Sequence, residues 1–120
     1  MDFDHFSVAL LILRADAPQL DGHEAAALQD AHLAHLADLH DAGHLLAAGP
    51  LAFDDPEESL AGLSILTVDA ERARALSEQD PAVRAGRFAI KVLPWMVPAG
   101  AIASSPAARF PRSAAEAAAA

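Results

Sequence analysis

The side chains most able to do chemistry in this sequence are its histidines, because the chain has six of them and no cysteine. Four fall within residues 32–44, which read HLAHLADLHDAGH. An imidazole can take up or release a proton near neutral pH, and it is also a common metal ligand. The absence of cysteine excludes disulfides, zinc–thiolate sites and thiol nucleophiles. Acid–base chemistry and histidine-based metal binding therefore remain to be weighed.

The spacing of these histidines argues against a metal site. His32 and His35 lie one helical turn apart, but Gly43 is expected to end the helix, so His40 and His44 do not share a helical face. The sequence has no HExxH pattern, and it has neither a GxGxxG motif nor a phosphate-binding loop. We therefore expect no metal ion and no other cofactor.

Residues 24–42 predict a long helix that points one histidine inward. At about 100° per residue, His32 falls in the sector that carries the leucines, and His35 lies at its rim. The opposite side carries small and acidic residues: Asp30, Ala34, Ala37, Asp38 and Asp41. A buried imidazole needs a partner for each ring nitrogen, or it lines a cavity. From the residues alone, a satisfied core histidine is the more common case, and a general acid/base is the alternative.

The remaining elements place this helix on a sheet. Apolar runs predict strands at 6–13, 44–53, 60–68 and 88–96. A second helix is predicted at 70–78, followed by a short helical turn at 82–85. The order β-α-β-β-α-β predicts the ferredoxin-like α+β fold, with four antiparallel strands and both helices on one face of the sheet. The other face still carries apolar residues, so we expect a homodimer that buries it against a second sheet.

Three prolines refine this arrangement. Pro50, which follows Gly49, and Pro94 cannot donate to a strand ladder, so their strands are expected to bend or to lie at sheet edges. Pro81 suits the first position of the short helical turn, with Asp80 as its N-cap. Capping alone is a sufficient structural role for Asp80.

Charge and composition limit the partners. Seventeen acidic residues against eight basic ones give a formal charge of −9, which argues against binding to nucleic acid or to an anionic membrane surface. The longest apolar run is too short to span a bilayer, and the acidic N-terminus is unlike a secretory signal, so a cytoplasmic protein is expected. Residues 1–98 are expected to form one domain. Residues 99–120, rich in Ala, Ser and Pro, predict a mostly flexible tail that docks in part through Phe110.

Two segments resemble a known family. AHLAHLADLHDAGHLLAAGPL at 31–51 and EQDPAVRAGRFAIKVLPW at 78–95 are similar to the two motif blocks of the YCII-related domain family, and the distance between them also fits. The resemblance extends over residues 6–97. It implies a ferredoxin-like fold that dimerises into an α+β barrel, and a pocket with a catalytic His–Asp pair. By position, that pair is His32 and Asp80. One type of member is a lyase that removes chloride from a chlorinated hydroxyquinone.

The resemblance gives Asp80 a second role, which is to orient His32 and to stabilise its protonated form. One carboxylate could serve as cap and as partner through its two oxygens. Four further residues are candidates for substrate binding: Gly49, Pro50, Trp95 and Arg14. Gly49 would let a ligand approach closely, Trp95 could line the pocket or the dimer interface, and Arg14 could hold an anionic substrate. Each also has a structural explanation, as a strand irregularity, a packed aromatic residue or a solvated strand end.

Together these features predict a small-molecule enzyme, a lyase or isomerase that needs no cofactor and uses His32 as general acid/base with Asp80 as its partner. The sequence does not specify the substrate. The alternative is a non-catalytic module that binds a metabolite or acts as an accessory dimerisation domain. A hydrogen-bonded pair beside an accessible cavity would support the enzyme. A His32 packed on all sides, with Asp80 remote, would exclude the pair.

Overall fold

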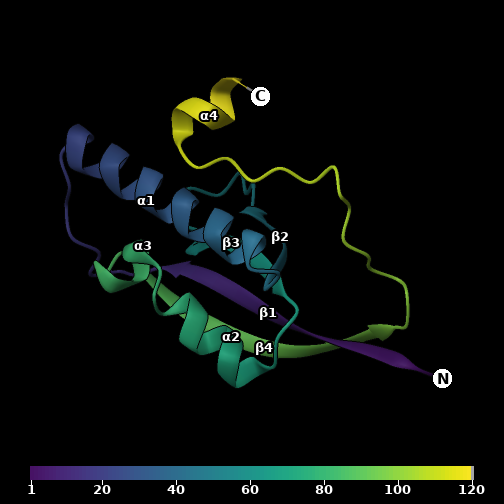
Figure 1. Cartoon of the computed structure of the whole chain (residues 1–120). Coiled ribbons are helices and arrows are strands. Elements are labelled where there is room, and N and C mark those ends of the chain that lie inside the picture. Colours follow the sequence, from purple (N-terminus) through teal and green to yellow (C-terminus); the bar gives the residue numbers. More distant parts are fainter. Residues whose placement is uncertain (120) are drawn as a thin grey trace.

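The computed structural model describes residues 1–119 and follows the predicted element order (Figure 1). The elements are β1 (Phe3–Leu13), α1 (Gly22–Asp41), β2 (Leu45–Pro50), β3 (Leu60–Leu66), α2 (Ala70–Ser77), α3 (Pro81–Arg84), β4 (Phe88–Pro98) and α4 (Ala114–Ala119). The first seven follow the order β-α-β-β-α-β, with α3 as a short addition after the second helix. The ferredoxin-like α+β fold is thus confirmed.

The strands form one four-stranded antiparallel sheet in the order β2-β3-β1-β4. The central strand β1 pairs with β3 and β4, so that Val8 lies opposite Ile65 on one side and Leu93 on the other. The edge strands β2 and β4 contain Pro50 and Pro94, as predicted. A proline is tolerated there because an edge strand has one side without a neighbouring ladder.

Strand lengths differ from prediction because pairing, not apolar content, sets them. The second strand, expected at 44–53, ends at Pro50, after which residues 51–59 leave the sheet. The first strand begins earlier than expected, because Phe3 pairs with Pro98 at the far end of β4. The two outer ends of β1 and β4 therefore continue together beyond the apolar runs.

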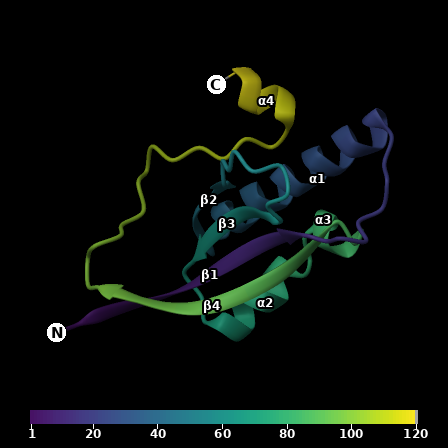
Figure 2. The same cartoon turned by 180° about the vertical axis from the view of Figure 1, so that it is seen from behind.

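Helices α1 and α2 cover one face of the sheet and enclose the core. Seen from behind, β1 and β4 lie in front of α2 and α3 (Figure 2). The buried cluster between the layers is small and aliphatic: Ala9, Leu39, Leu45, Leu66, Ala73 and Leu76. The opposite face carries Trp95 and Leu93, each 40% exposed, from the edge strand β4.

The long helix α1 has well-defined ends. Asp21 caps its start by accepting a hydrogen bond from the Glu24 backbone N–H at 2.7 Å, so the helix begins at Gly22 rather than at the expected residue 24. This bond holds the pKa of Asp21 below its usual range. The helix ends before Gly43, whose φ of 81° is the left-handed conformation expected of a glycine in that position.

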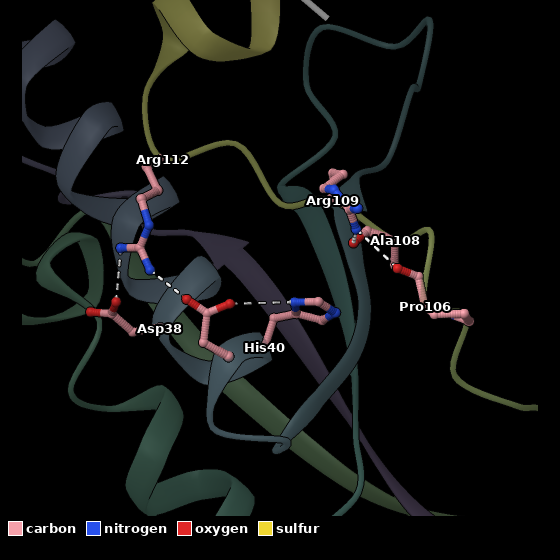
Figure 3. A network of polar contacts seen from close by, with 7 residues as sticks. Asp38, His40, Pro106, Ala108, Arg109 and Arg112 are labelled. Atoms are coloured by element: carbon pink, nitrogen blue, oxygen red, sulfur yellow. Dashed lines mark hydrogen bonds and ion pairs between the residues drawn. The ribbon is translucent and has the colours of Figure 1, made fainter.

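The tail, residues 99–120, returns along α1 in its described part (Figure 1). Phe110 stacks on His40 with ring centroids 4.3 Å apart, which confirms the predicted docking. The Arg112 guanidinium donates to Asp38 Oδ1 at 2.9 Å and to Asp41 Oδ2 at 2.6 Å (Figure 3). These carboxylates raise the pKa of Arg112 above its ordinary value. The expectation that the rest of the tail is flexible stays a prediction.

The docked tail corrects one feature of the helical projection. Ala37 was placed on the solvent side of α1, yet it is only 2% exposed. The tail lies along this side of the helix, where Arg112 pairs with Asp38 and the Ala114 N–H donates to Asp30 Oδ1. Ala37 directly precedes Asp38 and lies one turn before Asp41, the two residues that Arg112 contacts. A projection of one helix does not include the segment that covers it.

Replacing Arg112 by alanine should loosen the tail without unfolding the domain, because it removes both ion pairs to α1 and leaves the core unchanged. We expect faster backbone hydrogen–deuterium exchange and faster limited proteolysis within residues 99–119. Arg109→Ala is the matched control, since the Arg109 guanidinium donates only to the Pro106 and Ala108 carbonyls of the tail itself (Figure 3). Equal exchange rates in the two variants would contradict this account of docking.

Candidate active site

His32 and Asp80 meet between α1 and α3. His32 comes from the middle of α1, and Asp80 is the N-cap of α3. The His32 Nδ1 atom lies 2.6 Å from Asp80 Oδ2, and the other carboxylate oxygen, Oδ1, accepts a hydrogen bond from the Ala82 backbone N–H at 2.9 Å. Each oxygen of Asp80 thus has its own partner, and the catalytic part of the predicted double role stays a prediction.

The pair is withdrawn from solvent. The Asp80 side chain is 4% exposed and the His32 side chain 13%. A buried carboxylate is costly unless it is paired and hydrogen-bonded, and here each oxygen has a partner. With Asp80 ionised, the carboxylate can only accept hydrogen bonds, so this contact then requires the proton on Nδ1 of His32. In the neutral ring, Nε2 is then the nitrogen with a lone pair.

The second ring nitrogen of His32, Nε2, is not fully buried. Nε2 makes no hydrogen bond to the described residues. Within residues 1–119, no fully buried side-chain nitrogen or oxygen lacks a partner, so Nε2 must retain some accessible surface. Nε2 is therefore the ring nitrogen of His32 that has no partner among the described residues.

His35, one turn further along α1, shows the contrasting case. Its Nε2 atom lies 3.1 Å from the Leu76 backbone carbonyl oxygen, which is a hydrogen bond between α1 and α2. It has no carboxylate partner within ion-pair distance among the described residues. His35 is thus a structural histidine that joins two helices.

A cavity of about 160 Å³ lies next to the pair. Its walls come from the loop before α1, the first half of α1, α3 and the start of β4: Leu20, Ala25, Leu28, Gln29, Ala82, Arg87 and Phe88. His32 is not itself a wall residue, but Leu28 precedes it by one turn and the Phe88 ring centroid lies 6.4 Å from its own. Ala82 is also the residue that donates to Asp80. Ala82 and Phe88 thus line the cavity and also lie next to the His32–Asp80 pair.

The four other predicted site residues lie elsewhere in the chain. Arg14 is exposed, and its guanidinium donates twice to Asp16, at 2.8 and 2.9 Å. Gly49 and Pro50 line a separate cavity of about 360 Å³ between α1, β2 and the tail. Trp95 lies on the open face of the sheet, away from the helices. Their predicted part in substrate binding stays a prediction, and none of them lines the cavity beside the pair.

Arg87 and Gln29 are polar wall residues that sequence reasoning missed. The pairing of β1 with β4 is the feature that could have pointed to Arg87. In the observed register Leu13 pairs with Phe88, and the Arg14 backbone N–H donates to the Arg87 carbonyl at 2.9 Å. The two arginines therefore flank the same strand ends, and only the register distinguishes which one reaches the cavity.

The fold and this site define a ferredoxin-like α+β domain with a buried histidine–carboxylate pair. The chain belongs to the YCII-related domain family, whose sequence profile matches residues 8–96. It is 44% identical over 67 residues to Protein YciI of Escherichia coli O6:H1 and of Shigella flexneri, an alignment that covers 51% of this chain and 68% of those proteins.

A solved structure shares the fold. It is the 5-chloro-2-hydroxyhydroquinone dehydrochlorinase of Burkholderia phenoliruptrix in complex with 2,5-dihydroxybenzoquinone, which superposes with a TM-score of 0.52 at 23% identity. The match covers 75% of this chain and 92% of that one. Among residues 1–119, no helix is long and apolar enough to cross a membrane. The cytoplasmic location stays a prediction.

Replacing Asp80 by alanine should be unusually costly for an N-cap. It removes the acceptor for the Ala82 N–H and leaves the part-buried His32 Nδ1 without a partner, so we expect a loss of about 2–3 kcal/mol in the free energy of unfolding. The matched control is Asp69→Ala, because Asp69 is an exposed N-cap with one bond, to the Arg72 N–H. That variant should lose about 1 kcal/mol. Equal losses in urea denaturation would contradict the double role.

Proposed function

We propose that this protein is a small-molecule enzyme, a lyase or isomerase that needs no cofactor, in which His32 transfers a proton and Asp80 positions it. One observation carries the proposal: the 2.6 Å contact between His32 Nδ1 and the buried Asp80 carboxylate. This contact leaves Nε2 as the reactive nitrogen. The alternative of a non-catalytic binding module would not require an oriented imidazole with an accessible lone pair.

The chemistry follows from the arrangement. Nε2 removes a proton from a C–H or O–H group of the substrate, and the electron pair of that bond stays on the substrate. The imidazolium that forms keeps its Nδ1–H directed at Asp80, whose negative charge stabilises it. In an elimination the electron pair then forms a double bond and expels a leaving group. In an isomerisation the same nitrogen returns the proton to a different atom.

The comparisons support this class of reaction without specifying the substrate. The dehydrochlorinase with the same fold is named for a chlorinated hydroxyhydroquinone and was solved with a dihydroxybenzoquinone. Removal of hydrogen chloride is an elimination, which is the kind of reaction that a single positioned base can promote. At 23% identity that likeness bears on the fold of this chain, so the choice of substrate is open to experiment.

A second copy of the chain is the proposed partner. The open face of the sheet presents an apolar hollow of about 330 Å³ lined by Val8, Leu63, Ile65, Leu93, Pro94 and Trp95. An exposed apolar patch of this kind usually marks an interface, because leaving it in water is unfavourable. Two such faces packed together would form the α+β barrel implied by the family resemblance.

Catalysis is tested by supplying the wild-type protein with cyclic hydroxy-carbonyl compounds, including 5-chloro-2-hydroxyhydroquinone, in D2O. Exchange of C–H for C–D and release of chloride would report proton removal and elimination. His32→Gln should lower either rate by about 10²–10⁴-fold, as loss of a general base does. His35→Gln is the matched control, because glutamine can still donate to the Leu76 carbonyl. Binding without exchange or turnover in the wild type would favour the metabolite-binding module.

The dimer is tested by analytical ultracentrifugation of the full chain. Wild-type protein should sediment as a dimer, and Trp95→Asp should sediment as a monomer because it places a charge on the buried apolar face. Met96→Asp is the control, since Met96 alternates to the other side of the edge strand and is 57% exposed. A wild-type protein that remains monomeric at high concentration would refute the dimer.

A further inference from the structure

Arg87 has an environment that no other basic residue of the chain shares. Of the eight lysines and arginines, it alone is partly buried, and the other seven are exposed. No carboxylate of residues 1–119 lies within ion-pair distance of its guanidinium. Arginines are seldom withdrawn from water without a partner. The seventeen acidic residues of the chain make this absence of pairing more notable.

The guanidinium of Arg87 is held at the cavity beside the His32–Asp80 pair. Its central carbon lies 5.2 Å from the centroid of the Phe88 ring, which is within the range of a cation–π contact. Both residues line the cavity. The contact with the ring face leaves the five N–H donors of the guanidinium without a protein acceptor among the described residues, so they are available to a ligand.

Arg14 differs from Arg87 because its guanidinium already has a carboxylate partner. It lies beside Arg87 through a backbone hydrogen bond, but its own guanidinium is occupied by both carboxylate oxygens of Asp16. Those hydrogen bonds hold the pKa of Asp16 below its usual range, so Asp16 remains a charged partner of Arg14. The uncompensated positive charge at these strand ends therefore belongs to Arg87.

The size and lining of the cavity limit what it can hold. Its volume of about 160 Å³ is close to that of an engineered cavity of about 150 Å³ in another protein, which binds benzene. Leu20, Leu28 and Phe88 supply apolar walls that suit a ring. Gln29 and Arg87 supply the polar groups. A single six-membered ring with an acidic substituent matches both the volume and the mixed lining.

We propose that Arg87 determines specificity by binding the anionic oxygens of a monocyclic substrate whose ring lies against Phe88. The guanidinium presents its donors as a planar fork, which matches a carboxylate or two neighbouring ring oxygens. The proposed anion site depends only on Arg87 and the cavity, and not on catalysis by His32. Its link to catalysis, through the nearby Nε2 of His32, rests on the proposed function.

The test compares benzoate with its neutral counterpart benzamide as probes of the full-length protein, by NMR titration of 15N- and 13C-labelled samples. Benzoate should bind the wild type at least about tenfold more tightly, because a hydrogen bond between charged groups contributes more than a neutral one. Benzoate binding should shift the NMR signals of the Phe88 ring and of the Leu28 methyl groups. Shifts confined to Trp95 or to Phe110 would place the probe in another hollow and overturn the proposal.

Variants then identify the group responsible. Arg87→Met keeps the aliphatic stem and should abolish the preference for benzoate, Arg87→Gln should do the same, and Arg87→Lys should retain part of it. Arg14→Met should leave the preference unchanged. A preference that persists in both uncharged Arg87 variants, or no preference in the wild type, would overturn the proposal. If one uncharged variant unfolds, the other still decides the test. The preference of Arg87→Lys for benzoate should then lie between those of the wild type and the remaining uncharged variant.

The outcome is separable from that of the proposed function. His32→Gln should keep the preference for benzoate, because the imidazole does not hold the anion. A preference that depends on Arg87, together with no turnover of any compound, would support the anion site and refute the enzyme. Turnover that depends on His32, with no effect of Arg87 on anion binding, would refute the anion site and leave the enzyme in place.

Discussion

The carboxylate of Asp80 is the interaction on which the site depends. The Asp80 side chain is 4% exposed, and its two oxygens bind a side chain of α1 and the backbone of α3. Burial makes these bonds obligatory, since an unpaired carboxylate in this position would be strongly destabilising. The same bonds connect segments that lie 48 residues apart and set the orientation of the His32 ring. One group therefore links the stability of the fold to its proposed chemistry.

The architecture explains how this carboxylate reaches the middle of α1. The β1-centred sheet places α1 and the α2–α3 segment on the same face, and the aliphatic cluster around Leu39 and Leu76 sets their spacing. The turn from α2 into α3 then brings Asp80 beneath His32. His35 comes from the same helix but meets a backbone carbonyl of α2. The two histidines differ because His32 contacts a carboxylate and His35 contacts a backbone carbonyl.

Local signals predicted most of the fold. Proline placed β2 and β4 at the edges, Gly43 ended α1, and Asp80 was recognised as a cap from the Asp-Pro pair. The pairing of Asp80 with His32 followed from the family resemblance. The burial of Ala37 was not predictable from a projection of α1 alone. The position of Arg87 at the cavity was not predictable either, because it depends on the register between β1 and β4. Arg14, Gly49 and Trp95 were grouped by residue type, and the structure distributes them over three different surfaces.

The most direct test of the central claim is the tautomer of His32, measured by 15N NMR of histidine-labelled protein at a pH where the ring is neutral. A hydrogen bond to an ionised Asp80 requires the proton on Nδ1. The account predicts a protonated Nδ1 with a far-downfield proton signal, and an unprotonated Nε2. In Asp80→Asn that signal should move, because the amide is a weaker acceptor. A neutral His32 with its proton on Nε2, or a ring that exchanges freely between both tautomers, would contradict the account.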